Sequence, residues 1–206
     1  MPRPSRLLPS RLLFVVLLLP AMARANVTGS KHDFSGQGWG TNEICVFCHT
    51  PHNANTAIAG SPLWNHQVTA ATYTLYTSPS LRNPTSQPRG PSKRCLSCHD
   101  GAVAIDSYGT HSGTHFVTGP ANLGTDLGND HPVSVSWTHQ TLAPGAPSCG
   151  TCHIGGHGGW APMPLPFYGG SVECPTCHEP HDKGAETKML RKALTGSAIC
   201  LHCHGK

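Results

Sequence analysis

All ten cysteines of this chain fall into five copies of one pattern, Cys-x-x-Cys-His. In chain order the cysteine pairs are Cys45 and Cys48, Cys95 and Cys98, Cys149 and Cys152, Cys174 and Cys177, and Cys200 and Cys203. The motif histidines are His49, His99, His153, His178 and His204. The pattern is typical of c-type haem attachment. Two thiols three residues apart can each form a thioether to one porphyrin edge, and a helical turn then brings the next residue, histidine, beneath the iron. We therefore predict five covalently attached haems c, each with its motif histidine as the proximal ligand.

Two other uses of cysteine fit the pattern less well. A structural zinc site closes with four ligands, often two Cys-x-x-Cys pairs, and five pairs leave a remainder. A disulfide between cysteines three residues apart would staple almost nothing within one helical turn. Haem attachment is the interpretation that uses every cysteine.

The second axial ligand of each iron is predicted to be a histidine. The chain has 15 histidines, whereas Met163 and Met189 are the only methionines after residue 25. Histidine pairs favour lower reduction potentials than His/Met ligation. An isolated loop histidine is more often simply solvated, but five irons need partners. The predicted distal ligands are His32, His52, His66, His131 and His181, and those held in reserve are His111, His115, His139 and His157.

His52 and His181 each stand three residues after a motif histidine, in Cys-His-Thr-Pro-His and Cys-His-Glu-Pro-His. Neither can reach round to the far face of the haem held by its own motif. Each is therefore predicted to bind a neighbouring iron, which would bring haems into contact.

The first 25 residues resemble a secretory signal peptide. Arg3, Arg6 and Arg11 precede an apolar run over 12–19, and a small-x-small cleavage pattern occupies 23–25. The apolar run is too short to span a bilayer, so no membrane span is predicted. We expect a secreted protein, extracellular or at the cell surface, with the periplasm as the alternative.

Without the signal, Lys and Arg balance Asp and Glu at ten each, and nothing indicates nucleic-acid binding. Leu, Ile, Val and Phe make up only about 15% of residues 26–206, below the proportion with which ordinary chains fold. Frequent Gly and Pro interrupt long elements. We predict one domain over 26–206, mostly coil with short helices at the motifs and little regular sheet, wrapped around a core of stacked haems.

Several stretches together resemble the OmcE-type multihaem cytochromes, a family of extracellular cytochrome nanowires. They are KHDFS at 31–35, ICVFCHTPHN at 44–53, PLWNH at 62–66, CLSCHDGAVAIDS at 95–107, GNDHPVSVS at 128–136, ECPTCHEPH at 173–181 and AICLHCHGK at 198–206. The resemblance implies self-association into a filament in which one iron takes a histidine from the adjacent subunit. His32, near the predicted mature N-terminus, is the candidate. Such head-to-tail contacts need not close, which produces open filaments.

The chain departs from this family in having a fifth motif, at Cys149 to His153, in a Gly/Pro-rich insert over about 143–170. His139 or His115 is predicted to complete its iron. The favoured function is extracellular electron transfer by a haem-wire filament that passes electrons to redox partner proteins or extracellular acceptors. The alternatives are a discrete periplasmic carrier and a haem-dependent reductase. An enzyme would need an open iron position with acid–base groups beside it, so we predict an electron-transfer protein without catalytic residues.

Overall fold

The computed structural model describes residues 26–58, 63–81, 83–136, 165–181 and 187–204. The predicted signal peptide, the third motif at Cys149 to His153 and the candidate ligands His139 and His157 lie outside the described residues. The side chain of His202 is also outside them.

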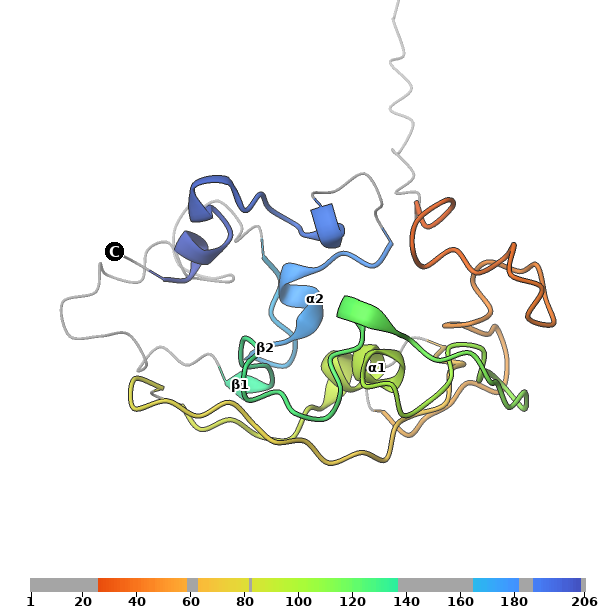
Figure 1. Ribbon diagram of the computed structural model, residues 1–206, viewed down its shortest axis with the longest axis horizontal. Helices are drawn as coiled ribbons and strands as arrows, with labels where there is room; N and C mark the ends of the chain where they lie inside the picture. The colour runs from red at the N-terminus through yellow and green to blue at the C-terminus, as the bar shows by residue number, and fades with distance from the viewer. Residues whose placement is uncertain (1–25, 59–62, 82, 137–164, 182–186, 205–206) are drawn as a thin grey trace, which may run out of the picture.

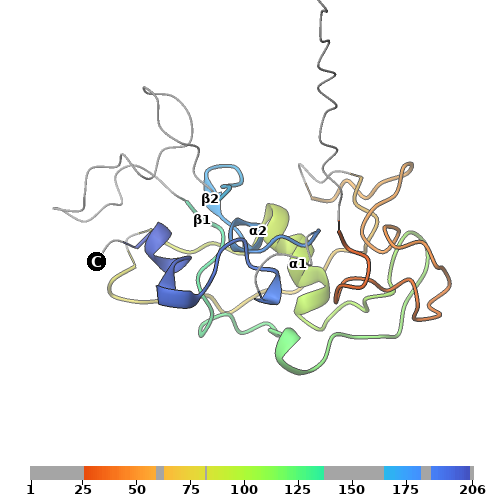
Figure 2. The ribbon, with the colours of Figure 1, turned by 90° about the horizontal axis from the view of Figure 1, so that it is seen from above.

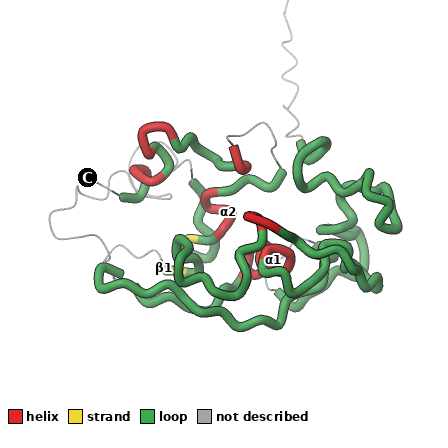
Figure 3. Tube along the Cα trace, viewed as in Figure 1, coloured by secondary structure: helices red, strands yellow, loops and turns green. Residues whose placement is uncertain are grey.

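The described chain is mostly coil and turns, as Figure 3 shows, and this confirms the predicted fold class. Its α-helices are α1 (Gly90–His99) and α2 (Cys174–Cys177). Strands β1 (Val135–Ser136) and β2 (Ser171–Val172) pair antiparallel, with Val135 opposite Val172. The described chain also contains four short 3₁₀ helices: η1 (Gly119–Ala121), η4 (Thr187–Met189), η5 (Thr195–Ser197) and η6 (Cys200–His202).

Proline starts both α-helices at positions where it is compatible with helix geometry. Pro91 and Pro175 lie in the first turns of α1 and α2, where the missing N–H would have had no partner within the helix. The N-cap of α2 is Glu173, whose side chain and that of Thr176 form a reciprocal capping box. Helix α1 is followed by Gly101 at φ +72°, the left-handed conformation that commonly ends a helix.

The first motif departs from the prediction of a helix at each attachment site. Residues 44–48 form hydrogen-bonded turns, and the His49 N–H donates to the Cys45 carbonyl at 2.8 Å. This bond closes a single α-type turn that does not extend into a helix. A lone turn is the usual outcome where no further residues propagate it, because nucleation is unfavourable. The other described motifs lie on α1, α2 and η6.

The hydrophobic interior is divided into small clusters. Tyr73, Leu96 and Leu127 form one, and Leu165, Leu190 and Ile199 form another. Polar side chains such as Ser92, Ser97, Asp100, Asp106 and Glu173 are buried beside them. Clusters of this size bury little apolar surface, so porphyrins attached at the motifs would supply much of the missing interior.

Helix α1 is fixed at its C-terminal end by a buried aspartate. The Asp100 carboxylate accepts hydrogen bonds from Thr69 Oγ1 at 2.6 Å and from the Tyr73 hydroxyl at 2.7 Å. The Asp100 N–H donates to the Leu96 carbonyl at 2.9 Å. The adjoining motif histidine, His99, is thereby held on a rigid element.

The second position of the motif offers a matched test of packing. Leu96, in the second motif, is 1% exposed, and Leu201, at the same position of the fifth motif, is 41% exposed. We expect Leu96→Ala to lower the free energy of unfolding of the haem-loaded protein by roughly 2 to 5 kcal/mol. Leu201→Ala should lower it by less than about 1 kcal/mol. Denaturant titration followed by circular dichroism measures both, and equal losses would contradict the assignment of Leu96 to a core.

Candidate haem sites

The four described motifs follow one another along the long axis of the molecule. Figures 1 and 2 both place the first motif, in the orange segment, at one end and the fifth, in the blue segment, at the other, with α1 and α2 between them. The order along this axis is therefore first, second, fourth, fifth.

Thiols of successive motifs approach one another in the same order. Burial and then the proximity of Cys48 raise the pKa of the Cys98 thiol, and burial, then Cys174 and then Cys200 raise the pKa of the Cys177 thiol. Between these pairs, the Cys95 and Cys174 thiols share a hydrogen bond. A thioether would join each cysteine to a porphyrin edge. Each contact between cysteines of two motifs would therefore bring two porphyrins together. The sites are spaced for a continuous series.

Three motif histidines face a histidine from a distant part of the chain. The ring centroids of His49 and His181 are 6.0 Å apart, those of His99 and His32 are 6.1 Å apart, and those of His204 and His131 are 6.2 Å apart. When two imidazole nitrogens bind one metal from opposite sides at about 2 Å, the ring centroids lie roughly 6 Å apart. The three pairs thus have the spacing that fits one iron each.

Hydrogen bonds from Nδ1 orient several of these rings. His99 Nδ1–H donates to the Ala121 carbonyl at 2.7 Å, and His178 Nδ1–H donates to the Lys188 carbonyl at 3.0 Å. His131 Nδ1 similarly lies 3.0 Å from the Pro132 carbonyl. A proton fixed on Nδ1 leaves Nε2 as the ligand atom, which is the usual arrangement at metal-bound histidines.

His32 lies within its own chain's row of sites. Burial, and then the proximity of His99, lower the pKa of His32, which keeps the ring neutral and its lone pair available to a metal. The rings of His181 and His178 are also near enough to lower this pKa. The structure thus gives His32 a partner in its own chain, and this position does not favour the subunit-bridging role expected for it.

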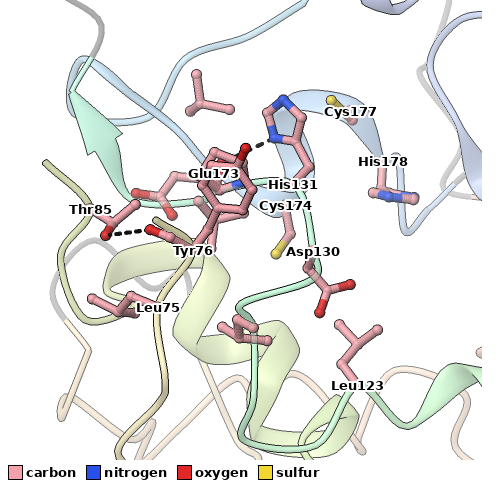
Figure 4. A pocket seen from close by; sticks show the side chains of 14 residues that line it. Leu75, Tyr76, Thr85, Leu123, Asp130, His131, Glu173, Cys174, Cys177 and His178 are labelled. Atoms are coloured by element: carbon pink, nitrogen blue, oxygen red, sulfur yellow. Dashed lines mark hydrogen bonds between the residues drawn. The ribbon is translucent and has the colours of Figure 1, made fainter. Parts of the chain in front are cut away.

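The fourth motif opens onto a cavity that Figure 4 shows from close by. The cavity has a volume of about 230 Å³, somewhat below the usual range of small-molecule and cofactor pockets. Cys174, Cys177 and His178 lie on its wall, and apolar side chains such as Leu75 and Leu127 contribute to the lining. Two thiols, a histidine with Nδ1 anchored and an apolar wall are the donor set and surroundings that a c-type haem requires.

His178 has no facing imidazole among the residues that the structure describes. His52 is exposed, in a loop where the His52 N–H donates to Thr50 Oγ1 and the Thr50 hydroxyl donates back to the His52 carbonyl at 2.8 Å. It faces no motif histidine within the described part of its own chain. After the three pairs, His178 remains without a facing imidazole in the described chain, and His52, His111 and His115 remain exposed.

His66 is 1% exposed and sits beside the second motif without facing a motif histidine. Its Nδ1 is 2.7 Å from the Gln67 carbonyl and its Nε2 is 3.0 Å from the Ala104 carbonyl. Both nitrogens are thus engaged by the backbone. The distal role of His66 stays a prediction that this arrangement does not support.

His115 is held by a carboxylate that sequence analysis did not single out. The Asp106 carboxylate is buried and accepts hydrogen bonds from His115 Nδ1 at 2.8 Å and from the Thr114 and His115 N–H groups. These bonds hold the pKa of Asp106 at about 2 in spite of its burial. The exposed His115 ring keeps Nε2 available as a ligand atom, as its predicted reserve role requires. The nearest sequence signal was the position of Asp106 shortly after the second motif.

The Cys48 and Cys98 thiols do not have the character of redox-active thiols, whereas a hydrogen bond with the Cys95 thiol lowers the pKa of Cys174. Burial raises the pKa of Cys48 to about 11 and also raises the pKa of Cys98. Reactive Cys-x-x-Cys pairs depend on the opposite shift. Among the described residues, no group of three or more His, Cys, Asp and Glu side chains is placed to hold a metal ion. No helix in the described part is long and apolar enough to cross a membrane.

The site geometry and the comparison with known families agree at the level of protein class. Residues 166–206, which contain the fourth and fifth motifs, match the family model described as the doubled CXXCH motif. The match indicates that this segment is similar to multihaem c-type cytochromes, which bind haem c covalently and transfer electrons. No curated protein matches the chain.

Replacing His181 should open one iron. We expect the haem-loaded His181→Ala protein to gain one high-spin haem that binds carbon monoxide, because His49 would lose its facing ligand. His111→Ala is the matched control, since His111 stacks on Tyr108 and faces no motif histidine. Carbon monoxide difference spectra measure the change. An unaltered spectrum for His181→Ala would contradict the His49–His181 pair.

Proposed function

We propose that this protein carries electrons outside the cell along a row of bis-histidine haems that continues from subunit to subunit in a head-to-tail filament. The observation that carries the proposal is the linear order of the described motifs, supported by the thiol contacts and the three histidine pairs. Bound haem supplies a one-electron Fe(III)/Fe(II) couple. The polypeptide's part is to fix the orientation and ligation of each haem and to keep adjacent haems close.

The contact between subunits is assigned to His52 and His178. His178 lacks a facing imidazole in the described part of its own chain, and its Nδ1 is already fixed to the Lys188 carbonyl. His52 is exposed and follows the first motif, whose orange segment lies at one end of the molecule in Figure 1. Insertion of His52 from one subunit opposite His178 of the next would satisfy both, and it would bring the first-motif end of one row against the fourth site of the next. The bridging role expected for His32 therefore passes to His52.

Symmetry between two sequence motifs supports this choice. His52 and His181 occupy the same position in Cys-His-Thr-Pro-His and Cys-His-Glu-Pro-His. His181 lies opposite the motif histidine of another site, 6.0 Å from His49. The proline before each histidine restricts the chain to an extended direction away from its own motif. His52 would lie opposite a motif histidine of the neighbouring subunit, as His181 lies opposite His49 within one subunit.

A discrete carrier is the second candidate function. It is favoured if His178 keeps an open position in the secreted protein, because a filament of this design leaves none. The same open iron is the feature that a haem-dependent reductase would need. The resemblance of residues 1–25 to a signal peptide supports export of either form, and we propose the cell surface as the location because a filament would extend from it.

The proposal predicts that His52→Ala abolishes filaments without preventing haem attachment. Electron microscopy of the purified, haem-loaded protein should show filaments for the unaltered chain and for His111→Ala, and discrete particles for His52→Ala. The discrete particles should contain one carbon monoxide-binding haem. In His32→Ala the new high-spin haem should belong to the second motif, and filaments should persist. Filaments of normal length in His52→Ala would refute the bridging role.

The number of haems is tested separately. We expect the intact mass of the secreted protein, cleaved after residue 25, to correspond to five haems. Joint replacement of Cys149 and Cys152 by Ala should remove one haem and leave filaments intact, because the other four motifs form the row. A mass corresponding to four haems in the unaltered protein would show that the third motif is not loaded.

A further inference from the structure

A buried carboxylate lies in the wall of the fourth motif's cavity. Glu173 is 2% exposed and immediately precedes Cys174, and both residues line the cavity with Cys177 and His178 (Figure 4). The buried acid has a structural role as the N-cap of α2. N-caps are usually short polar residues at the surface, and such a cap does not require an ionisable group in the interior.

The carboxylate is enclosed mainly by neutral groups. The hydroxyls of Ser92, from α1, and Ser134, from the residue before β1, donate to Oε2, the latter at 3.0 Å. The Thr176 N–H donates to the same side chain in the capping box. These donors hold the carboxyl group in one place in either protonation state, because a hydroxyl can also accept a hydrogen bond.

The charged and titratable groups around Glu173 come from two sides. Arg89, at the N-cap of α1, attracts the carboxylate, and Arg94 on α1 interacts with it at longer range. The groups that line the cavity are Tyr76, Asp130, His131 and His178. Burial raises the pKa of Glu173, whereas the serine hydroxyls and Arg89 lower it, and burial is the largest of these effects.

We propose that Glu173 is a proton-binding residue of this haem pocket, whose carboxylate takes up one proton from water when the iron bound by His178 is reduced. The electron comes from a redox partner or an electrode. In this step Fe(III) and the carboxylate, with one electron and one proton, give Fe(II) and the carboxylic acid. This inference rests on the electron-transfer function proposed above, and it adds that one haem of the row exchanges protons with solvent as it exchanges electrons.

The coupling follows from electrostatics. The oxidised haem core carries one more positive charge than the reduced core, and a positive charge stabilises a nearby carboxylate. Reduction removes this positive charge. In a pocket of low dielectric the loss raises the proton affinity of Glu173, by roughly tenfold for charges about 10 Å apart. Conversely, the ionised carboxylate favours Fe(III) and so lowers the reduction potential of this haem. Local charge and burial are among the features by which a protein sets a haem's reduction potential.

The test uses the full, haem-loaded protein reduced at an electrode in weak buffer. Proton uptake per chain is measured from about pH 5 to about pH 9, together with the midpoint potentials. Glu173→Gln keeps the size and one acceptor oxygen of the side chain but cannot ionise. We expect it to take up fewer protons on reduction, by up to one per chain. One midpoint potential should rise and lose its pH dependence, which for a one-electron couple approaches about 59 mV per tenfold change in proton concentration.

Glu43→Gln is the matched control. Glu43 also lies shortly before the first cysteine of a motif, but it is exposed. Its replacement should leave proton uptake unchanged. Equal proton uptake by the unaltered protein and Glu173→Gln would overturn the inference, because a purely structural cap would give that result.

A second variant keeps the inference testable if Glu173→Gln fails to load haem. Ser134→Ala removes one donor to the carboxylate, which disfavours the ionised form and should move the pH-dependent range to higher pH. An unmoved range would overturn the inference. Intact mass and filament formation are measured on the same samples, so failure of the proposed function shows as missing haem or missing filaments in the unaltered protein. Failure of this inference alone leaves both in place.

Discussion

The pairing of imidazoles from distant parts of the chain is the constraint on which the rest of the structure depends. His32 reaches His99, His131 reaches His204, and His181 reaches back to His49. Each pair closes a long loop, and loop closure is unfavourable unless something at the junction compensates for the lost entropy. An iron bound from both sides would compensate, and its binding free energy would become folding free energy. The short helices and the two-residue strands hold these junctions in place but could not create them.

This constraint explains why so many polar side chains are buried in a chain with few aliphatic residues. Asp100, Asp106 and Glu173 each anchor a segment beside a haem motif, and each is surrounded by hydroxyls, N–H groups or an imidazole. A buried carboxylate is tolerable only when such donors satisfy it. In a larger hydrophobic core, aliphatic packing would orient the motifs. Here hydrogen bonds do so, and they impose defined geometry at the places where axial ligation demands it.

Much of this could be predicted from the sequence because covalent spacing is local. The motifs identify the haem-binding residues, and the composition predicts coil around small helices. The distal ligands depend on the tertiary structure, which no rule of residue spacing predicts. The predicted distal residues His131 and His181 lie opposite motif histidines, whereas His66 is enclosed by backbone carbonyls, and the ligand roles of all three stay predictions. The roles of Asp106 and Glu173 could not be predicted, because a lone acid in a loop has no periodicity and its burial depends on segments far away in the sequence.

The choice of the two histidines proposed to join subunits follows from the same pairing rule. Within one subunit the rule brings three histidines opposite three motif histidines, and it leaves His52 exposed at one end and His178 unmatched in the described chain. In the proposed filament, a pairing that does not close inside a subunit would be satisfied by a neighbour, and because the donor and acceptor are different surfaces, the contact would repeat without limit. Polymerisation then needs no large hydrophobic interface, since one metal–ligand bond per contact fixes both position and orientation. The interaction that folds each subunit would thus be the one that joins it to the next.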